Sequence, residues 1–558
     1  MPDRLDAVME LARRRGFFWP AYETYGGSAG LYVFGDLGVK LSANMADLWR
    51  DIFVRPYGFM EVDTPCLLPA PILEASGHVS NFKDPMAECA SCSRKYRADH
   101  LIGEAGGKVS EAASPDEMLA SMEGLKVRCP ECGGSSWTVR PFLTMFETGI
   151  GPYAEGKGYL RPETAQGIFV EFNRLLEIER ERVPLGIAQV GRGFRNEISP
   201  RQGMVRLREL HMMELEMFVD PEDATCPYME DVRGTRLLLL DGARLAEGSE
   251  EPREASVEDA LSQGMIKTEW LAFFMALSQR FLTELGIPPE RQRFREKLSG
   301  ERAHYSAQTF DHEVLMDGMG WLEVAGHAYR TDYDVASHMK KTGADYLASV
   351  RLARPTRERR RIWSINVGAL KAAQPERWKE VLKEYGGIKD RTGEPPVSLA
   401  GVRVEPSFLV TKEDEVVVET RKFVPHVVEP SFGLERLMLA CMVHAYSRQE
   451  DRTVLKLPYR LAPVKVGVFP LVNRAEMEKT AKELLPAARK EGAVYDESGS
   501  IGRRYARIDE IGVPLGITVD GQTLQDGTVT VRDRDTWRQE RVNAAEIPSE
   551  IRKRLTAS

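Results

Sequence analysis

Residues 189–218 read QVGRGFRNEISPRQGMVRLRELHMMELEMF, and this stretch decides the fold. Apolar and polar residues largely alternate in both halves, which is typical of β-strands that bury one face. Proline and glycine interrupt the alternation in the segment SPRQG at 199–203, which predicts a loop. The whole stretch is therefore expected to form a β-hairpin.

The polar face of this predicted hairpin combines glycines, arginines and carboxylates. Arginine binds phosphate through paired hydrogen bonds, and carboxylates bind amines, so this face suits a small and highly charged ligand. Gly191 and Gly193 are expected to leave space above the sheet. A solvated sheet face is the alternative interpretation. The residues predicted on the polar face are Gln189, Gly191, Gly193, Arg195, Glu197, Arg206, Arg208, Glu214 and Glu216.

Composition narrows the class of protein. The chain has 558 residues, enough for roughly two to four domains. Its 42% hydrophobic and 29% charged residues are ordinary for a soluble protein, and the net charge of −8 gives no general sign of nucleic-acid binding. No apolar run is long enough for a membrane helix and no signal peptide is evident, so a cytoplasmic protein without membrane contact is expected.

Four of the seven cysteines form two C-x-x-C pairs, Cys89 with Cys92 and Cys129 with Cys132. Two such pairs are typical of a tetrahedral zinc site rather than of a disulfide framework. No ligand position is left open, so the predicted role of Zn²⁺ is structural. The segment 103–114 between the pairs is expected to be an irregular excursion.

Periodicity predicts the remaining elements. A helix with the stripe Leu41–Ile52 precedes a strand at 59–65, and 266–285 is a long amphipathic helix whose apolar stripe is expected in the core. A strand is expected at 319–328, and the basic run 351–361 is interpreted as solvated surface, with RNA contact as the minority alternative. From Pro458 onward, alternating strands and helices predict a three-layer α/β unit whose second helix has a basic side, with Arg503, Arg504 and Arg507.

Three segments resemble the class II aminoacyl-tRNA synthetases, in their glycyl branch. FRNEISPRQG and RLRELHMMELEMF at 194–218 resemble the second signature motif of that family. VEPSFGLERL at 428–437, a strand, a glycine turn and a helix, resembles the third motif. RPETAQG at 161–167 is similar to a segment that lines the amino-acid site in the glycyl branch. A fourth stretch, the helix and strand that end at Pro65, resembles the first motif of the family, which forms the dimer interface.

The resemblance implies an α+β fold, with an antiparallel-sheet catalytic domain that carries inserts and a C-terminal anticodon-binding domain. The implied divisions are 1–80 with the dimer motif, 81–140 as a zinc-ribbon-like insert, 141–220 as catalytic core with the ATP-binding hairpin, 221–310 as a helical insertion, 311–457 as the rest of the core, and 458–558 as the anticodon-binding domain. The implied partners are ATP, glycine, tRNA(Gly) and a second copy of the chain.

The resemblance also implies roles for individual residues. Arg195 and Arg436 would be catalytic, and Glu323 would hold Mg²⁺ on the ATP phosphates. The implied ATP-binding residues are Arg195, Asn196, Glu197, Val205, Arg206, Leu207, Arg208, Glu209, Leu210, Glu323, Val324, Gly433 and Arg436. The implied glycine-binding residues are Arg97, Glu163, Leu210, Glu214, Glu429, Ser431 and Gly433.

The sequence leaves three other classes of protein as alternatives. Another class II synthetase, such as the prolyl or threonyl enzyme, is disfavoured by RPETAQG and VEPSFG. A synthetase-like accessory subunit of a DNA polymerase, which binds nucleic acid without catalysis, is expected to lack the charges that Arg195, Glu197 and Arg436 supply. A zinc-ribbon binding protein accounts for too little of the chain. The expected reaction is the ATP-dependent formation of glycyl-adenylate and the transfer of glycine to the 3′ end of tRNA(Gly).

Overall fold

The computed structural model describes residues 4–109, 113–200, 203–298, 301–302, 305–388, 391–392, 394–449 and 452–556. The chain divides into two compact units. The larger contains Met1–Glu179, Pro184–Tyr346 and Val424–Ser558, and the smaller contains Arg180–Val183 and Leu347–Phe423. Residues 347–423, which fall inside the expected core division 311–457, form most of the smaller unit.

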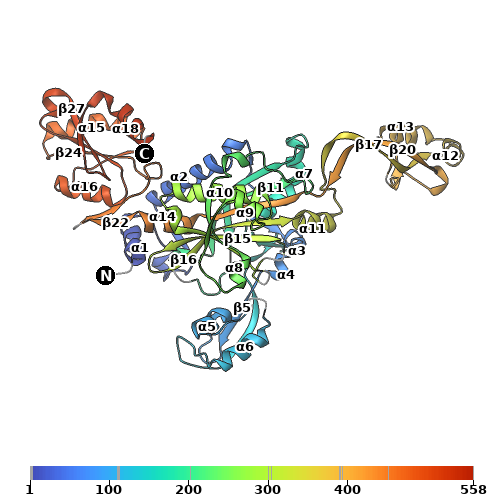
Figure 1. Ribbon diagram of the computed structural model, residues 1–558, viewed down its shortest axis with the longest axis horizontal. Helices are drawn as coiled ribbons and strands as arrows, with labels where there is room; N and C mark the ends of the chain where they lie inside the picture. The colour runs from blue at the N-terminus through green and yellow to red at the C-terminus, as the bar shows by residue number, and fades with distance from the viewer. Residues whose placement is uncertain are drawn as a thin grey trace. The chain divides into compact units, whose positions relative to one another are not determined.

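A nine-stranded sheet forms the centre of the larger unit (Figure 1). Neighbouring strands are antiparallel except for β12 with β14 and β10 with β3. In spatial order the strands are β13 (Arg253–Ser256), β12 (Arg236–Leu240), β14 (Gln292–Glu296), β15 (Gln308–Met316), β16 (Gly320–Thr331), β21 (His426–Gly433), β11 (Glu209–Val219), β10 (Leu185–Phe194) and β3 (Met60–Glu61).

The predicted hairpin is confirmed as β10 and β11, and its alternation is correct. Gln189 lies opposite Glu214 on one face, and Ala188 lies opposite Leu215 on the other. The arms are shorter than expected, because the ladder ends at Phe194 opposite Glu209. Residues 195–200 and 203–208 are therefore not strand ends, and they contain one 3₁₀ turn, Gly203–Val205. Arg201 and Gln202, which belong to the predicted loop 199–203, lie outside the described residues.

The apolar face of the sheet packs against three helices, α2 (Asp36–Phe53), α10 (Glu269–Glu284) and α14 (Leu434–Ala445). Met213, Leu215 and Phe432 from the sheet are buried in one core with these helices. The stripes predicted for α2 and α10 are confirmed, since their apolar residues lie in the same core. Burial of one face in this way leaves the carboxylate-bearing face of β11 directed away from the main core.

Helix α7 (Ala165–Ile178) packs against the polar face of β11, where Phe172 lies 4.5 Å from Phe218 between ring centroids. Contrary to expectation, Gly191 and Gly193 do not leave open space. A Cβ at Gly191 would lie 2.4 Å from Nη2 of Arg161, and one at Gly193 would lie 3.1 Å from the carbonyl oxygen of Pro162. The glycines instead allow the 161–167 segment to lie directly on the strand, because any side chain there would displace it.

Smaller elements complete the larger unit. The short sheets are β1 (Phe18–Pro20) with β2 (Tyr32–Phe34), β4 (Leu67–Pro69) with β9 (Gly156–Leu160) and β8 (Glu147–Ile150), β6 (Lys95–Arg97) with β5 (Lys83–Cys89) and β7 (Trp137–Leu143), and β22 (Tyr446–Gln449) with β23 (Arg452–Leu455). The remaining helices here are α1 (Arg4–Arg15), α3 (Ala70–Ala75), α4 (His78–Asn81), α5 (Ala98–Glu104), α6 (Pro115–Gly124), α8 (Gly242–Ala246), α9 (Val257–Ser262) and α11 (Tyr333–Thr342).

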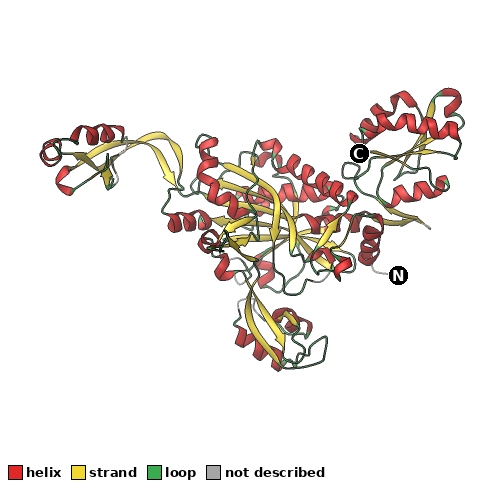
Figure 2. Ribbon diagram, turned by 180° about the vertical axis from the view of Figure 1, so that it is seen from behind, coloured by secondary structure: helices red, strands yellow, loops and turns green. Residues whose placement is uncertain are grey.

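The C-terminal region forms the expected three layers, with helices on both faces of a five-stranded sheet (Figure 2). Its elements are β24 (Val466–Pro470), α15 (Ala475–Arg489), β25 (Ala493–Tyr495), α16 (Ile501–Glu510), β26 (Leu515–Val519), α17 (Thr523–Asp526), β27 (Thr528–Asp533), β28 (Gln539–Asn543) and α18 (Ile547–Thr556). The expected basic side of α16 is only partly present. Arg504 is buried and donates to the carbonyl oxygens of Pro470 and Gly499, which makes it a structural residue.

The smaller unit is built on a long two-stranded antiparallel sheet of β17 (Ala348–Ile365) and β20 (Leu409–Phe423). Its own core includes Trp363, Leu370 and Phe408. The other elements are α12 (Val367–Ala373), α13 (Trp378–Gly387), β18 (Ser398–Leu399) and β19 (Val402–Arg403). The basic run 351–361 lies on β17, and most of its side chains are exposed, as the sequence predicted.

Candidate active site

A cavity opens on the polar face of the central sheet, where β16, β21 and β11 lie side by side. Ser431 on β21 pairs with Glu214 on one side and with Gly326 on the other. A Cβ at Gly326 would meet nothing within 4 Å, so this part of the floor is open. The lining residues are Arg195, Glu197, Met204, Val205, Arg206, Leu207, Leu210, Met212, Glu323, Val324, Ala325, Gly326, Ser431, Gly433, Glu435 and Arg436.

Three guanidinium groups reach this cavity from separate segments. Arg195 follows β10, and its Nε donates a 3.3 Å hydrogen bond to the carbonyl oxygen of Pro162. Arg436 lies in the first turn of α14, where Nε donates to the carbonyl oxygen of Val205 over 3.0 Å. Arg206 donates to Nε2 of His100 over 3.1 Å. Burial lowers the pKa of Arg206, and so does the charge of Arg97, which shows that positive charge is concentrated here.

Glu323 lies on β16 at the edge of the same cavity. Its Oε2 is 3.3 Å from Nη1 of Arg436, and its side chain is 45% exposed. Glu323 lines the cavity together with Glu197 and Glu435, and such a partly exposed carboxylate suits Mg²⁺, which binds through one or two carboxylates, water and the phosphates of a nucleotide.

Three of the residues predicted to bind ATP lie elsewhere. Asn196, Arg208 and Glu209 face a second pocket, formed with Ser28, Leu31, Phe146, Leu160 and Phe194. Arg208 donates to the carbonyl oxygens of Ala29 and Glu197, each over 3.0 Å, and so fixes the loop on which Glu197 lies.

Several buried carboxylates lie next to the cavity, where Ser431 lines it. Glu214 accepts hydrogen bonds of 2.6 Å from the backbone N–H of Thr164 and from Oγ of Ser431. Glu163 lies 3.3 Å from Nε2 of His78 and accepts a 3.2 Å bond from Gln166. Segments about 50 and 220 residues apart in the chain thus bring these groups to one place, and their role in glycine binding stays a prediction.

Arg330 occupies the centre of the acidic cluster and was not predicted from the sequence. Its side chain is fully buried, and it donates to Oε2 of Glu429 over 2.7 Å and to Oδ2 of Asp334 over 2.8 Å. Burial raises the pKa of Glu429 to about 7, although the charge of Arg330 opposes the increase. A strand predicted to continue beyond residue 328 would have included Arg330. Because Arg330 lies four residues after Gly326 on β16, the alternation of strand side chains would have placed both residues on the same face.

Arg97 does not join the acidic cluster in this structure. Its guanidinium donates to Asp84 over 2.9 Å and to Asp99 over 2.6 Å. It lines a pocket with His100 and Arg206, next to the arginine-rich cavity. The predicted glycine-binding set is therefore divided between two places.

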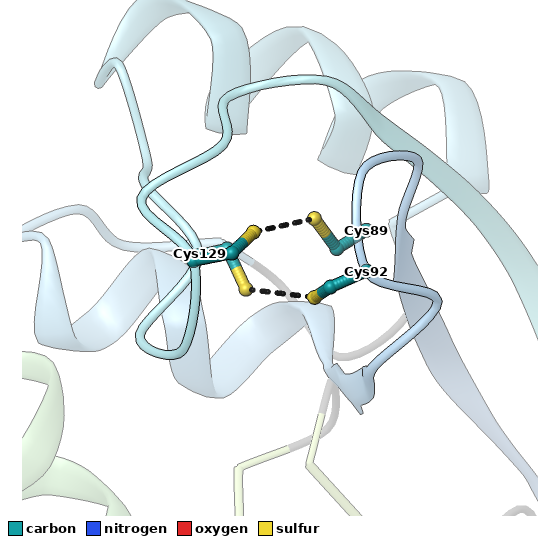
Figure 3. A group of neighbouring side chains, drawn as sticks. Cys89, Cys92 and Cys129 are labelled. Atoms are coloured by element: carbon teal, nitrogen blue, oxygen red, sulfur yellow. Dashed lines mark hydrogen bonds between the residues drawn. The ribbon is translucent and has the colours of Figure 1, made fainter.

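The four predicted metal ligands come together at two turns of the chain. Figure 3 shows Cys89 and Cys92 on one turn, facing Cys129 on the other. Sγ of Cys89 is 3.6 Å from Sγ of Cys132, and Sγ of Cys92 is 3.6 Å from Sγ of Cys129. All four sulfurs lie within 4.8 Å of one another. Four thiolates around Zn²⁺ with bonds of about 2.3 Å are separated by about 3.8 Å, so the set fits a tetrahedral zinc ion.

None of the helices within the described ranges is both long and apolar enough to cross a bilayer.

Known families match two parts of the chain. Residues 154–236 match the family described as tRNA synthetase class II core domain (G, H, P, S and T), and residues 465–554 match the family described as anticodon binding domain. The first range contains the hairpin and RPETAQG, and the second contains the C-terminal three-layer region. The class II core and α+β fold expected from the sequence are thereby confirmed.

Similar proteins cover nearly the whole length. A glycine–tRNA ligase of Aeropyrum pernix is 45% identical over 563 residues, which is 99% of this chain and 97% of the relative. A glycine–tRNA ligase of Thermococcus gammatolerans is 41% identical over 99% of this chain and 98% of the relative. One of Methanothermobacter thermautotrophicus is 41% identical over 98% of both chains. With this identity along its full length, the chain belongs to the glycine–tRNA ligases, a family of class II aminoacyl-tRNA synthetases.

Proposed function

We propose that this protein activates glycine with ATP and transfers it to the 3′ end of tRNA(Gly). The observation that carries the proposal is the junction of two kinds of site on one sheet face. An arginine-lined cavity suited to a polyanion adjoins a buried carboxylate cluster suited to an ammonium group. Ser431 belongs to both, because it lines the cavity and donates to Glu214. A carboxylate of glycine bound across this junction would face the α-phosphate of ATP.

In the first step, an oxygen of the glycine carboxylate attacks the α-phosphorus and pyrophosphate leaves. No protein nucleophile is required, so orientation and charge neutralisation supply the rate. We assign Arg195 to the α-phosphate, and Arg206 and Arg436 to the outer phosphates. Glu197 would accept from the adenine amino group. Glu323 would hold Mg²⁺, which supplies further positive charge at the phosphates when bound.

Glycine has only an ammonium and a carboxylate, so its recognition depends on charge and on limited space. We assign the ammonium to Glu163, Glu214 and Glu429. We assign the rejection of larger amino acids to steric exclusion at the α-carbon of the bound substrate. An added methyl group must clash in such a pocket, and a clash can discriminate better than a missing contact.

In the second step, a hydroxyl of the terminal ribose of the tRNA attacks the glycyl carbonyl carbon and AMP leaves. We assign recognition of the anticodon to residues 458–558, which contain the match to the anticodon binding domain family. The zinc ion at the four cysteines would stabilise the 81–140 insert. Its role would be structural, because four thiolates leave no coordination position for a substrate.

We further propose a homodimer in the cytoplasm, with α2 and β3 at the subunit interface as the resemblance to the first class II motif implies. The domain divisions given above remain a proposal, with residues 347–423 added as a separate insert. The decisive experiment is ATP–pyrophosphate exchange with each of the 20 amino acids. Glycine-dependent exchange alone would support the proposal, and exchange with proline or threonine instead would refute it.

A further inference from the structure

Glu216 is a buried carboxyl group that the reaction described above does not use. It lies on β11, two residues after Glu214, and its side chain is fully buried. Neither carboxylate oxygen has a hydrogen-bond partner among the residues that the structure describes. An ionised carboxylate at this fully buried position has no hydrogen-bond donor among the described residues, whereas a protonated one avoids the cost of burying a charge.

The strand register places Glu216 directly beside Glu429. Glu214 pairs with Ser431 and Met217 pairs with Val428, so Glu216 falls opposite Glu429 on the neighbouring antiparallel strand. Residues opposite one another in this way have Cβ atoms about 5 Å apart, and two like charges there repel. Both carboxyl groups are buried, so water cannot screen the repulsion.

The surrounding groups do not supply enough positive charge for every carboxylate. The acidic groups around Glu216 are Glu214, Glu429, Glu163 from the 161–167 segment and Asp334 from α11. Arg330 on β16 is shared among Glu429, Asp334 and Glu163. His78 on α4 contacts Glu163, His338 on α11 contacts Gln166 on α7, and Tyr305 stacks on Arg330. Among the described residues, one guanidinium and two imidazoles therefore lie among five carboxyl groups.

We propose that Glu216 and Glu429 hold one proton between them in the substrate-free enzyme, and that the ammonium of glycine expels this proton to solvent on binding. The proposal rests on the assignment of the cluster to glycine. The carboxylic acid loses its proton to the buffer, the resulting carboxylate pairs with the ammonium of the glycine zwitterion, and no other bond changes. Burial raises the pKa of Glu216 well above its usual value, with the charge of Glu429 adding to the increase, and burial raises the pKa of Glu429 to about 7.

The proposal gives glycine binding a defined pH dependence. Below the apparent pKa of the Glu216–Glu429 pair the free enzyme carries the extra proton, so the apparent Kd for glycine should fall about tenfold for each unit of increasing pH. Above that pKa the proton is already lost and the apparent Kd should level off. The ammonium of free glycine remains protonated throughout this range. Glycolate, which has a hydroxyl in place of the ammonium, should not displace the proton.

Titration calorimetry on the wild-type enzyme tests the proposal without any variant. Glycine is titrated at pH 6 and at pH 8.5, each in two buffers with different enthalpies of ionisation. We expect about one proton released per glycine at pH 6 and a smaller release at pH 8.5. Binding of glycine at pH 6 without proton release would overturn the proposal.

The Glu216→Gln variant tests which residue supplies the proton. Glutamine has the shape of a protonated glutamate, so the fold should be retained. Proton release at pH 6 should fall nearly to zero, and the Kd should become almost independent of pH between 6 and 8. Full proton release by Glu216→Gln would overturn the role of Glu216. The exposed control Glu258→Gln on α9 and the neighbouring variant His78→Gln should both still release the proton, and its loss in His78→Gln would assign it to the imidazole instead.

A third variant separates this proposal from the assignment of the glycine site. If Glu429→Gln binds glycine as tightly as the wild type, the cluster is not the glycine site and the proposed function of these residues fails. If Glu429→Gln loses glycine binding while the wild type releases no proton, the site assignment stands and only the proton coupling is wrong.

Discussion

Replacement of Arg195 by alanine should reduce adenylate formation far more than it reduces stability. In the structure its guanidinium makes one long hydrogen bond, 3.3 Å to the carbonyl oxygen of Pro162, and lies 5.6 Å from the ring of Phe82. Loss of such a bond costs about 0.5–1.5 kcal/mol of folding free energy. Loss of a preorganised donor to transition-state charge costs about 2.7–4 kcal/mol, or 10²–10³-fold in kcat.

The assay for Arg195→Ala is ATP–pyrophosphate exchange at saturating glycine, with Tm measured on the same preparation. Arg192→Ala is a matched control, because Arg192 lies three residues earlier, is exposed and pairs with Glu209 outside the cavity. Surface ion pairs contribute about 0–1 kcal/mol, so the control should keep nearly normal exchange. If Arg195→Ala retains exchange within about threefold of the control, Arg195 does not stabilise the transition state and the assignment of the α-phosphate is wrong.

Three further predictions concern glycine, zinc and tRNA. Glu429→Gln should raise the KM for glycine roughly ten- to a hundredfold, because a hydrogen bond to a charged group is lost, while the KM for ATP stays within a few-fold. A collapse of ATP binding with an unchanged KM for glycine would place Glu429 in the nucleotide site. Purified protein should contain about one zinc per chain, and Cys129→Ser should lose the metal and lower Tm; much less than one zinc in the wild type contradicts the site. Deletion of residues 463–558 keeps Leu457 and Leu461, so the main core should stay intact. The deletion should therefore raise the KM for tRNA far more than the KM for ATP or glycine. Equal charging of anticodon-swapped tRNAs by the full chain would refute anticodon recognition.

The elements of the fold that depend on local pattern were predictable. A period of two residues identified β10 and β11 and their faces, and a period of 3.6 identified α2 and α10. Strand ends were not predictable in the same way, because the ladder stops at Phe194 where the chain leaves its partner strand. The separate unit at 347–423 was also missed, since its core residues Trp363, Leu370 and Phe408 form a cluster that sequence order does not reveal.

The features of the candidate site divide in the same way, into those that a local sequence pattern reveals and those that depend on tertiary packing. The sequence by itself determined the family resemblance, the two C-x-x-C pairs and the charged motifs, because these are properties of short segments. The tertiary structure alone decided that Gly191 and Gly193 admit the 161–167 segment, that Arg330 joins Glu429 to Asp334, and that Glu216 is left without a donor. The physical reason is that packing, burial and charge pairing depend on side chains that are distant in the chain and adjacent in space, and a local pattern carries no information about which distant groups will meet.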